Sequence, residues 1–417
     1  MMRALLIVLA FAACRAQSPD DVLERARTRL RAAAAGVPRY TCTETVDRSY
    51  YRETRQAARG CDAIVANQRN GRSKLALTAT DRLRFDVEVA DAGFEIYAWP
   101  GASRIANEKV EEMAGGGPLG SGPFGPFLEG IFANRAVEFQ FLGQKSALLE
   151  YRYRVPPAAS HYRVNNGIAW TVTGYDGVFL LDPATAELKQ LTVRTLELPA
   201  DSSSCEATTK MDFSPLRIGE GEYLIPRETH LGVIGRDAGF TDNATVYANC
   251  REFRGESTVR FDDAPPQLPS TTAVRDDALA TKLPPGLAIS LALESAIDTA
   301  TAAAGDPISA RIANPVVDSA KRVLMPAGTV LHGRITQMEH HVEGENYFII
   351  GVSFDEVSMI LDSRSQMQGP RLQTGRRVVT TESKSGFHGG GVFLFPARQS
   401  QFIVPRGYTS LWITIAE

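Results

Sequence analysis

The sequence lacks the short motifs that mark the common classes of enzyme. No HExxH zinc motif, no GxSxG nucleophile elbow and no GxxxxGK[ST] phosphate loop occurs in its 417 residues, and each of these patterns places a group that a known chemistry needs. The stretch GSGPFG at 120–125 satisfies GxGxxG, but it contains Pro123 and is flanked by Pro118 and Pro126. A dinucleotide site needs a strand before this motif and a helix after it. We therefore expect a non-enzymatic protein with no cofactor.

Histidine is scarce, and its densest cluster does not have the spacing of a metal site. His340 and His341 are neighbours in EHHVEGE at 339–345. Adjacent residues of a strand point to opposite faces, so two adjacent imidazoles do not converge on one ion. Gly344 favours a turn directly after them. The sequence predicts a solvated hairpin tip here and no metal site.

An excess of positive charge is also lacking. The chain has 45 Lys and Arg against 48 Asp and Glu, for a formal charge of −3. Tyrosines do alternate with arginines in EYRYRV at 150–155, a pattern that a stacking platform for nucleic acid would use. Such a platform also needs a strongly basic groove, which a weakly acidic chain does not supply. We therefore expect no nucleic-acid partner.

No apolar run is long enough to cross a bilayer as a helix, and the longest lies at the start of the chain. Arg3 precedes the apolar segment 4–13, and small residues follow it. This is the pattern of a secretory signal peptide over residues 1–16, with Gln17 as the new N-terminus. Alternatively, FAAC at 11–14 resembles a lipobox, and a lipidated Cys14 would then attach the protein to a membrane. Either cleavage predicts an exported protein of the periplasm or cell envelope, and the second predicts an outer-membrane lipoprotein.

Cysteine is rare outside this leader, and its count is even. Cys42, Cys61, Cys205 and Cys250 read as two disulfides in an exported chain. A thiolate metal site needs CxxC-type spacing, which is missing. Among the three pairings, the local ones, Cys42–Cys61 and Cys205–Cys250, are favoured. Loop-closure entropy gives each of these about 3–4 kcal/mol.

Apolar and charged residues alternate along many segments. In RLRFDVEV at 82–89, every second residue from Leu83 to Val89 is apolar and the residues between are charged. Segments 137–141 and 147–155 repeat this alternation, which is typical of strands with one wet and one dry face. The sequence therefore predicts a mainly β fold. Its first domain, over 17–261, is expected to be a one-sided antiparallel, half-barrel-like sheet.

A short helix and the N-terminal helix are expected to cover the dry face of this sheet. Ser18 and Pro19 suit a helix start, and Gly36 suits its end. In 122–134, apolar residues recur at helical spacing. The helices either close an ordinary core or enclose an apolar ligand. The candidate ligand-binding residues are Phe85, Val87, Phe124, Phe127, Ile131, Phe139 and Phe141.

A second domain follows a linker. Residues 262–285 are rich in Pro, Asp and small residues and lack apolar periodicity. The remainder, 286–417, is again rich in strand patterns, apart from a polar, glycine-rich stretch at about 362–391 that we expect to be a flexible loop. Three phrases share the order Pro, Gly, strand: LPPGLAISLALESAID at 283–298, LMPAGTVLHGRI at 324–335 and FIVPRGYTSLWITI at 402–415. Each predicts a tight turn into a strand.

These three phrases resemble, in the same order, the C-terminal β-domain of the TrbI-type proteins of conjugation and type IV secretion. The resemblance covers 286–417 and implies a small β-barrel-like domain of a cell-envelope protein. In the first domain, FLLDPATAELKQLTV at 179–193 is a strand, an Asp-Pro-x-Thr turn and a second strand. That hairpin resembles one in periplasmic lipoprotein carriers of the LolA type, whose half-barrel sheet holds acyl chains.

The sequence thus predicts an exported envelope protein that binds an apolar ligand, such as a lipid or a lipoprotein acyl chain, or a protein partner, or both. Two alternatives stay open: a purely structural scaffold and a secreted hydrolase with dispersed active-site residues. A buried Asp, Glu or His with a strongly shifted pKa in a cleft would favour the hydrolase.

Overall fold

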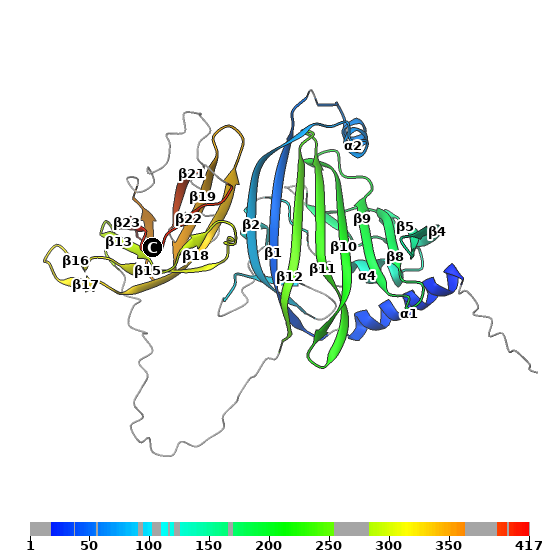
Figure 1. The fold of residues 1–417 in the computed structure, drawn as a ribbon, viewed down its shortest axis with the longest axis horizontal. Helices are drawn as coiled ribbons and strands as arrows, with labels where there is room; N and C mark the ends of the chain where they lie inside the picture. The colour runs from blue at the N-terminus through cyan, green and yellow to red at the C-terminus, as the bar shows by residue number, and fades with distance from the viewer. Residues whose placement is uncertain are drawn as a thin grey trace, which may run out of the picture.

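The computed structural model describes residues 18–36, 38–55, 57–90, 95–101, 110–115, 117–120, 126–165, 170–253, 283–362, 390–397 and 400–416. The expected signal peptide at 1–16, most of the expected linker, Phe124 and nearly all of the expected flexible loop lie outside these residues. The described chain is mainly β, as predicted. Figure 1 shows the strands up to β12 gathered in one body and the strands from β13 onward in another.

The first body is a large antiparallel sheet with neighbours in the order β3–β2–β1–β12–β11–β10–β9–β8–β5–β4. A small separate hairpin pairs β6 with β7. The strands are β1 (Tyr40–Glu53), β2 (Leu75–Val89), β3 (Glu95–Ala98), β4 (Glu138–Lys145), β5 (Leu148–Val155), β6 (Arg163–Asn165), β7 (Trp170–Val172), β8 (Tyr175–Leu181), β9 (Leu188–Thr195), β10 (Ser204–Ile218), β11 (Gly221–Gly235) and β12 (Phe240–Glu252).

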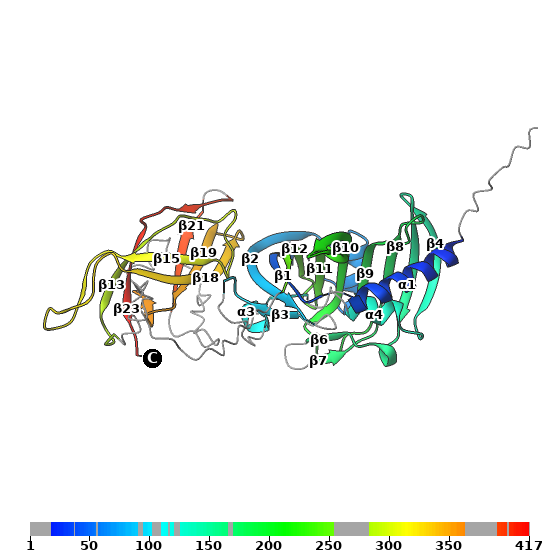
Figure 2. The same ribbon diagram turned by 90° about the horizontal axis from the view of Figure 1, so that it is seen from below.

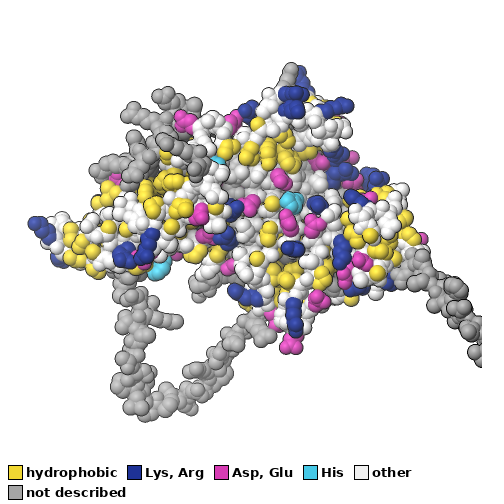
Figure 3. All heavy atoms as spheres, viewed as in Figure 1, with side chains coloured by type: hydrophobic (Ala, Val, Ile, Leu, Met, Phe, Trp, Pro, Cys, Tyr) yellow, Lys and Arg dark blue, Asp and Glu magenta, His cyan; other side chains and the backbone are white. Residues whose placement is uncertain are grey.

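The sheet has one wet and one dry face, as the alternation predicts. In β2, Leu83, Phe85 and Val87 are buried, whereas Arg82 and Arg84, which alternate with them, are partly exposed. Successive side chains of a strand point to opposite faces, so the apolar set gathers on one side. In Figure 3, charged side chains of both signs are scattered over the face that β1, β12, β11 and β10 turn to the viewer.

Helices cover part of the dry face. Helix α1 (Pro19–Gly36) begins where predicted, and the Oγ of Ser18 accepts a hydrogen bond from the Asp21 N–H at 3.2 Å. Its buried residues Val22, Ala26 and Leu30 pack in the same core as α4 (Pro126–Phe132). Figure 2 shows α1 and α4 together on one side of the sheet, under β8 and β4. The other helices are α2 (Cys61–Arg69), α3 (Val110–Met113) and the 3₁₀ turn Pro157–Ala159.

The cysteines form two disulfides, but the predicted pairing is wrong. The bonds join Cys42 to Cys250 and Cys61 to Cys205, across 208 and 144 residues. The cause is sheet topology, because β1 pairs antiparallel with β12 and brings the start of one strand beside the end of the other. Helix α2 likewise packs on β10. A preference for short loops cannot anticipate strand pairings between the two ends of a domain.

The second body is a smaller curved sheet. Its neighbours run β20–β23–β13–β15–β18–β19–β21, and a single bridge between Ile360 and Gly390 brings the ends together without closing a barrel. The strands are β13 (Ala288–Leu293), β14 (Ile297–Asp298), β15 (Pro307–Ile312), β16 (Val316–Val317), β17 (Val323–Met325), β18 (Val330–His341), β19 (Tyr347–Phe354), β20 (Met359–Leu361), β21 (Gly391–Pro396), β22 (Ile403–Val404) and β23 (Thr409–Thr414).

The three Pro-Gly phrases are turns that enter strands, as predicted. Gly286, Gly328 and Gly407 all have positive φ, between 80° and 89°, which glycine adopts without strain. Each also donates its N–H, at 2.8 Å, to a carbonyl of a neighbouring strand or strand end. The repeated phrase therefore has a structural role, namely to start a strand and fix its neighbour.

The two bodies meet along the outer edge of β2. Residues 79–81 of β2 pair with 339–341 of β18, and Leu83 forms a bridge with Ala304. Arg84 forms an ion pair with Asp306 just beyond that bridge. A Cβ atom on Gly305 would lie 2.2 Å from the carbonyl oxygen of Arg84, so the backbones approach as closely as they can here. This junction joins the bodies independently of the linker.

Candidate functional site

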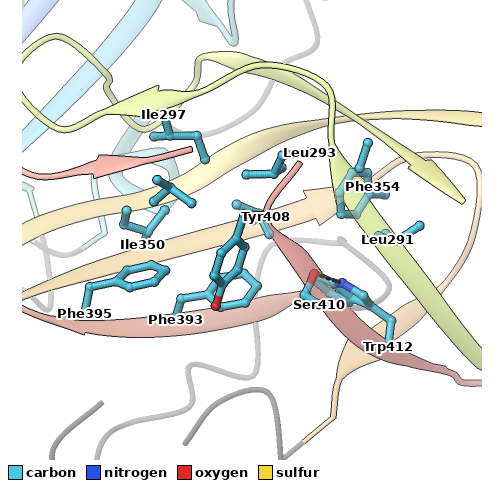
Figure 4. Close-up of a pocket in the computed structure, with 13 residues that line it drawn as sticks. Leu291, Leu293, Ile297, Ile350, Phe354, Phe393, Phe395, Tyr408, Ser410 and Trp412 are labelled. Atoms are coloured by element: carbon cyan, nitrogen blue, oxygen red, sulfur yellow. Dashed lines mark hydrogen bonds between the residues drawn. The ribbon is translucent and has the colours of Figure 1, made fainter. Parts of the chain in front are cut away.

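The second body contains an apolar pocket between its strands. Alternating residues of β13, β15, β19, β21 and β23 point inward and form its walls, as expected for strands whose inner face is buried. Figure 4 shows aromatic rings from β21 and β23 facing aliphatic side chains from β13 and β19. The lining residues are Leu291, Leu293, Ile297, Ala310, Ile350, Val352, Phe354, Phe393, Phe395, Val404, Tyr408, Ser410 and Trp412.

Three of the lining residues are partly exposed to solvent, and we call them the rim of the pocket. Leu293, Tyr408 and Ser410 are partly exposed, whereas the other lining residues are buried. Trp412 donates its indole N–H to the Oγ of Ser410 at 2.9 Å, which the dashed line in Figure 4 marks. Burial raises the pKa of the Tyr408 hydroxyl, so that group stays neutral. The pocket therefore has uncharged polar atoms near its rim and an apolar interior.

The pocket is small. The cavity that a water molecule could enter measures about 20 Å³, which is roughly the space of one water. A water there would find few hydrogen-bond partners, because the walls are almost entirely hydrocarbon and aromatic. Such a space favours an apolar group over water. Its size fits the end of one side chain and not a whole lipid chain.

The ligand candidates predicted from the sequence do not gather around one cavity. Phe127 and Ile131 are α4 residues buried in the core that α4 shares with α1, and Phe139 packs against that core. Phe85 and Val87 lie in a different core beside β3. Phe141 is 41% exposed on β4, and Phe124 lies outside the described residues. The structure thus divides the predicted set between two clusters and one exposed position.

Ring contacts fill the space around several of these residues. Phe85 stacks on Trp99 with ring centroids 5.5 Å apart and meets Tyr97 edge-on at 5.8 Å. In the other core, Phe132 lies edge-on to Phe179 at 5.0 Å, and the guanidinium of Arg27 lies 5.4 Å from the Phe139 ring centroid. Around these residues the inner face is occupied by the side chains of the protein itself.

One buried acid lies on the same inner face. Glu44 of β1 is fully buried, and neither carboxyl oxygen has a hydrogen-bond partner. Burial, followed by the nearby charge of Glu95, raises the pKa of Glu44 well above its usual value. Tyr97, whose hydroxyl donates to Glu95 at 2.8 Å, is close enough for Glu44 to raise its pKa as well. Because both oxygens of Glu44 are sealed from solvent, no substrate touches them in this conformation.

The histidine pair lies at the end of β18, beside a turn that contains Gly344, as predicted. His340 stacks on Phe348 at 4.2 Å, and His341 stacks on Tyr347 at 4.9 Å. The two rings therefore occupy opposite faces of the hairpin. Among the described residues, no group of three or more His, Cys, Asp or Glu side chains converges as metal ligands would.

Comparisons with known proteins give this chain no relatives. A scan against protein-family models, a search of curated proteins and a search of solved structures each found no match. Within the described part of the chain, no helix is long and apolar enough to span a bilayer.

Sequence reasoning missed both the pocket and the buried acid, although signals for each were present. Alternation in β13 and β21 puts Leu291 with Leu293, and Phe393 with Phe395, on one face. In YTCTETV at 40–46, Glu44 lies two residues from Cys42 and two from Val46, both apolar. Because every second residue of a strand points to the same face, this spacing places Glu44 on the dry face.

Proposed function

We propose that the chain is a non-enzymatic, exported protein of the cell envelope that acts by binding another protein. The apolar pocket of the second body carries this proposal, because it joins a partly exposed rim to a buried aromatic interior. Protein interfaces obtain much of their affinity from an apolar anchor that one partner inserts into such a pocket on the other. We propose that a partner inserts one aliphatic side chain past Leu293, Tyr408 and Ser410.

A protein anchor suits the pocket better than a lipid does. Sites that enclose a drug-sized or larger ligand measure roughly 300–1,000 Å³. The pocket here has space for about one water. A single side chain needs only a small rearrangement of Leu293, which is already partly exposed, whereas an acyl chain would require the whole sheet to open.

Export is the second part of the proposal, and the cysteines support it. Both disulfides join residues that are far apart in sequence, and bonds of this kind persist in oxidising compartments such as the periplasm. The expected signal peptide at 1–16, and the alternative lipidation of Cys14, belong to the same proposal. Sequencing the N-terminus of the protein from its own cells distinguishes cleavage before Gln17 from lipidation at Cys14.

Site-specific photocrosslinking in intact cells tests the anchor. A photoreactive phenylalanine analogue replaces Ser410 at the rim, and the same analogue replaces Val317 on the exposed β16–β17 hairpin as a control. We expect a discrete protein adduct from the rim position that the pocket-filling variant Leu293→Trp removes. Adducts of equal yield from both positions, or adducts that Leu293→Trp leaves unchanged, would reject the pocket as the anchor site.

Carriage of an apolar ligand by the first body is the second candidate function. The observation in its favour is that Phe139 is only partly buried and Phe141 is exposed at the margin of the helix-covered core. Native mass spectrometry of the purified protein tests this function. Retained lipid that disappears in Phe139→Ala and persists in Leu293→Trp would favour the carrier, and protein without lipid would exclude it.

A further inference from the structure

The strand β4 ends the large sheet and presents an open edge. Figure 1 shows β4 at the outer margin of the first body. It pairs with β5, and no strand of the described chain pairs with its other edge. An unpaired edge is a row of backbone donors and acceptors ready to bind another strand. Proteins commonly protect such an edge with charges, yet β4 has none between Glu138 and Lys145.

The middle of this edge is also apolar. Phe141 and Leu142 are 41% and 38% exposed and lie next to each other in β4. Exposed apolar residues are common singly, but two on an open edge form a surface suited to a second strand.

The order of residues in β4 makes the strand complementary to itself. Two copies of β4 can pair in antiparallel orientation with their centres aligned. In this register Glu138 of each copy lies opposite Lys145 of the other, at both ends of the strand EFQFLGQK. The same register places Phe141 opposite Leu142 in the middle. Opposite charges facing each other across strands are stabilising, and like charges are destabilising.

The bulge in β4 makes this register geometrically consistent. Glu138 lies opposite Arg154 of β5, whose side chain is on the outer face, and Lys145 reaches Glu150 on that same face at 3.5 Å. The bulge between Phe141 and Gly143 adds one residue, so the two ends of β4 share a face although they differ in sequence parity. Without it, Glu138 and Lys145 of two copies would lie on opposite faces of the joined sheet.

We propose that two copies of this chain associate by antiparallel pairing of their β4 strands, which joins their large sheets into one. A two-fold axis perpendicular to the sheet, between Phe141 and Leu142, relates the copies. The contact is isologous, so it closes at a dimer and does not propagate into a fibre. This association is independent of the pocket in the second body.

Analytical ultracentrifugation of the full disulfide-bonded chain over a concentration series tests the proposal. We expect a reversible monomer–dimer equilibrium in which Glu138→Lys alone or Lys145→Glu alone weakens association roughly tenfold, because each reverses two symmetric ion pairs. The double variant Glu138→Lys/Lys145→Glu is expected to recover association, since the opposite charges face each other again. Leu142→Lys should abolish the dimer, whereas Val323→Lys on the distant β16–β17 hairpin should not.

Thermal unfolding of each variant shows that the effects are not losses of fold. A wild-type chain that stays monomeric throughout the series would overturn the proposal. So would a dimer that tolerates Leu142→Lys, or a double variant that associates no better than the single variants.

Discussion

At the scale of single residues, Glu44 makes stability depend on pH. The folded protein holds the Glu44 proton to a higher pH than the unfolded chain does, because burial and Glu95 raise the pKa of that carboxyl. The folded state therefore binds more protons than the unfolded state once the pH exceeds the ordinary glutamate value. The contribution of Glu44 to stability is therefore greatest below that value and falls as pH rises. The total fall is about 1.4 kcal/mol for each pH unit by which folding raises the Glu44 pKa.

We expect Glu44→Gln to remove this dependence. Urea unfolding at pH 5 and pH 8 should show the wild type losing more stability between the two values than the variant. Glu220→Gln, in an exposed turn, is the control and should follow the wild type. Parallel pH profiles for wild type and Glu44→Gln would contradict the assignment.

A second residue-scale prediction concerns the buried ion pair of Arg48 and Asp81. The Nε and Nη2 atoms of Arg48 lie 2.6 and 2.7 Å from the two carboxylate oxygens of Asp81, and Tyr50 donates to Asp81 at 2.9 Å. The Arg48 side chain is only 3% exposed. Asp81→Ala leaves the Arg48 charge buried without its hydrogen-bonded carboxylate and should lower the free energy of unfolding by about 3–5 kcal/mol.

The exposed pair of Arg311 and Glu294 supplies the comparison. Glu294→Ala removes a partner from a guanidinium that is half exposed to water, so the loss should be at most about 1 kcal/mol. Chemical denaturation measures both values. Equal losses in the two variants would show that burial of Arg48 is not what makes its ion pair matter.

At the scale of elements, the junction between β2 and β18 depends on the absence of a side chain at position 305. Gly305 has φ +106°, and a Cβ there would meet the Arg84 carbonyl oxygen and the Trp99 ring. Gly344 in the β18–β19 turn also has positive φ but has no atom within 4 Å of its Cβ position. An alanine at either position would therefore be strained by the positive φ, but only at position 305 would it also be crowded.

We expect Gly305→Ala to loosen the junction and Gly344→Ala to leave it intact. Hydrogen exchange at residues 79–84 and 304–306 measures the junction directly. Exchange there should accelerate in Gly305→Ala only. Equal exchange in both variants would mean that the close approach of the backbones does not hold the two bodies together.

Elements are also where the sequence was most informative. Alternation in 82–89 predicts which side of β2 is dry, because strand periodicity is local. The Ser18 cap and the Pro-Gly turns are likewise local chemistry, and they are found where expected. The Asp182 turn behaves similarly, since its carboxylate accepts hydrogen bonds from the N–H groups of Ala184 and Thr185 at 2.8 and 2.9 Å.

Features that depend on which strands become neighbours could not be predicted in this way. Phe85 and Phe139 both lie in alternating segments, yet strand order places Phe85 in the core beside β3 and Phe139 against the core that contains α1 and α4. The pocket combines residues from β13 to β23, so no single segment contains its signature. Cys42 pairs with Cys250 for the same reason.

At the scale of the whole molecule, the observed disulfides should stabilise more than local ones would. Each closes a loop of well over a hundred residues, and the chain-entropy estimate for such loops is about 5 kcal/mol each. Non-reducing peptide mapping should recover the Cys42 and Cys250 peptides linked to each other. Recovery of Cys42 linked to Cys61 would restore the sequence-based pairing and contradict β1–β12 register.

The Cys42–Cys250 bond also determines which part of the chain would carry a force applied at the two ends of the first body. Phe253 donates its N–H to the Arg39 carbonyl at 2.8 Å, so the chain leaves the large sheet beside the point where it enters. A force applied between α1 and residue 253 would be carried by the Cys42–Cys250 disulfide. The strands between residues 42 and 250 would bear no tension from a force applied there, whereas a force applied to the second body would reach β2 through its pairing with β18.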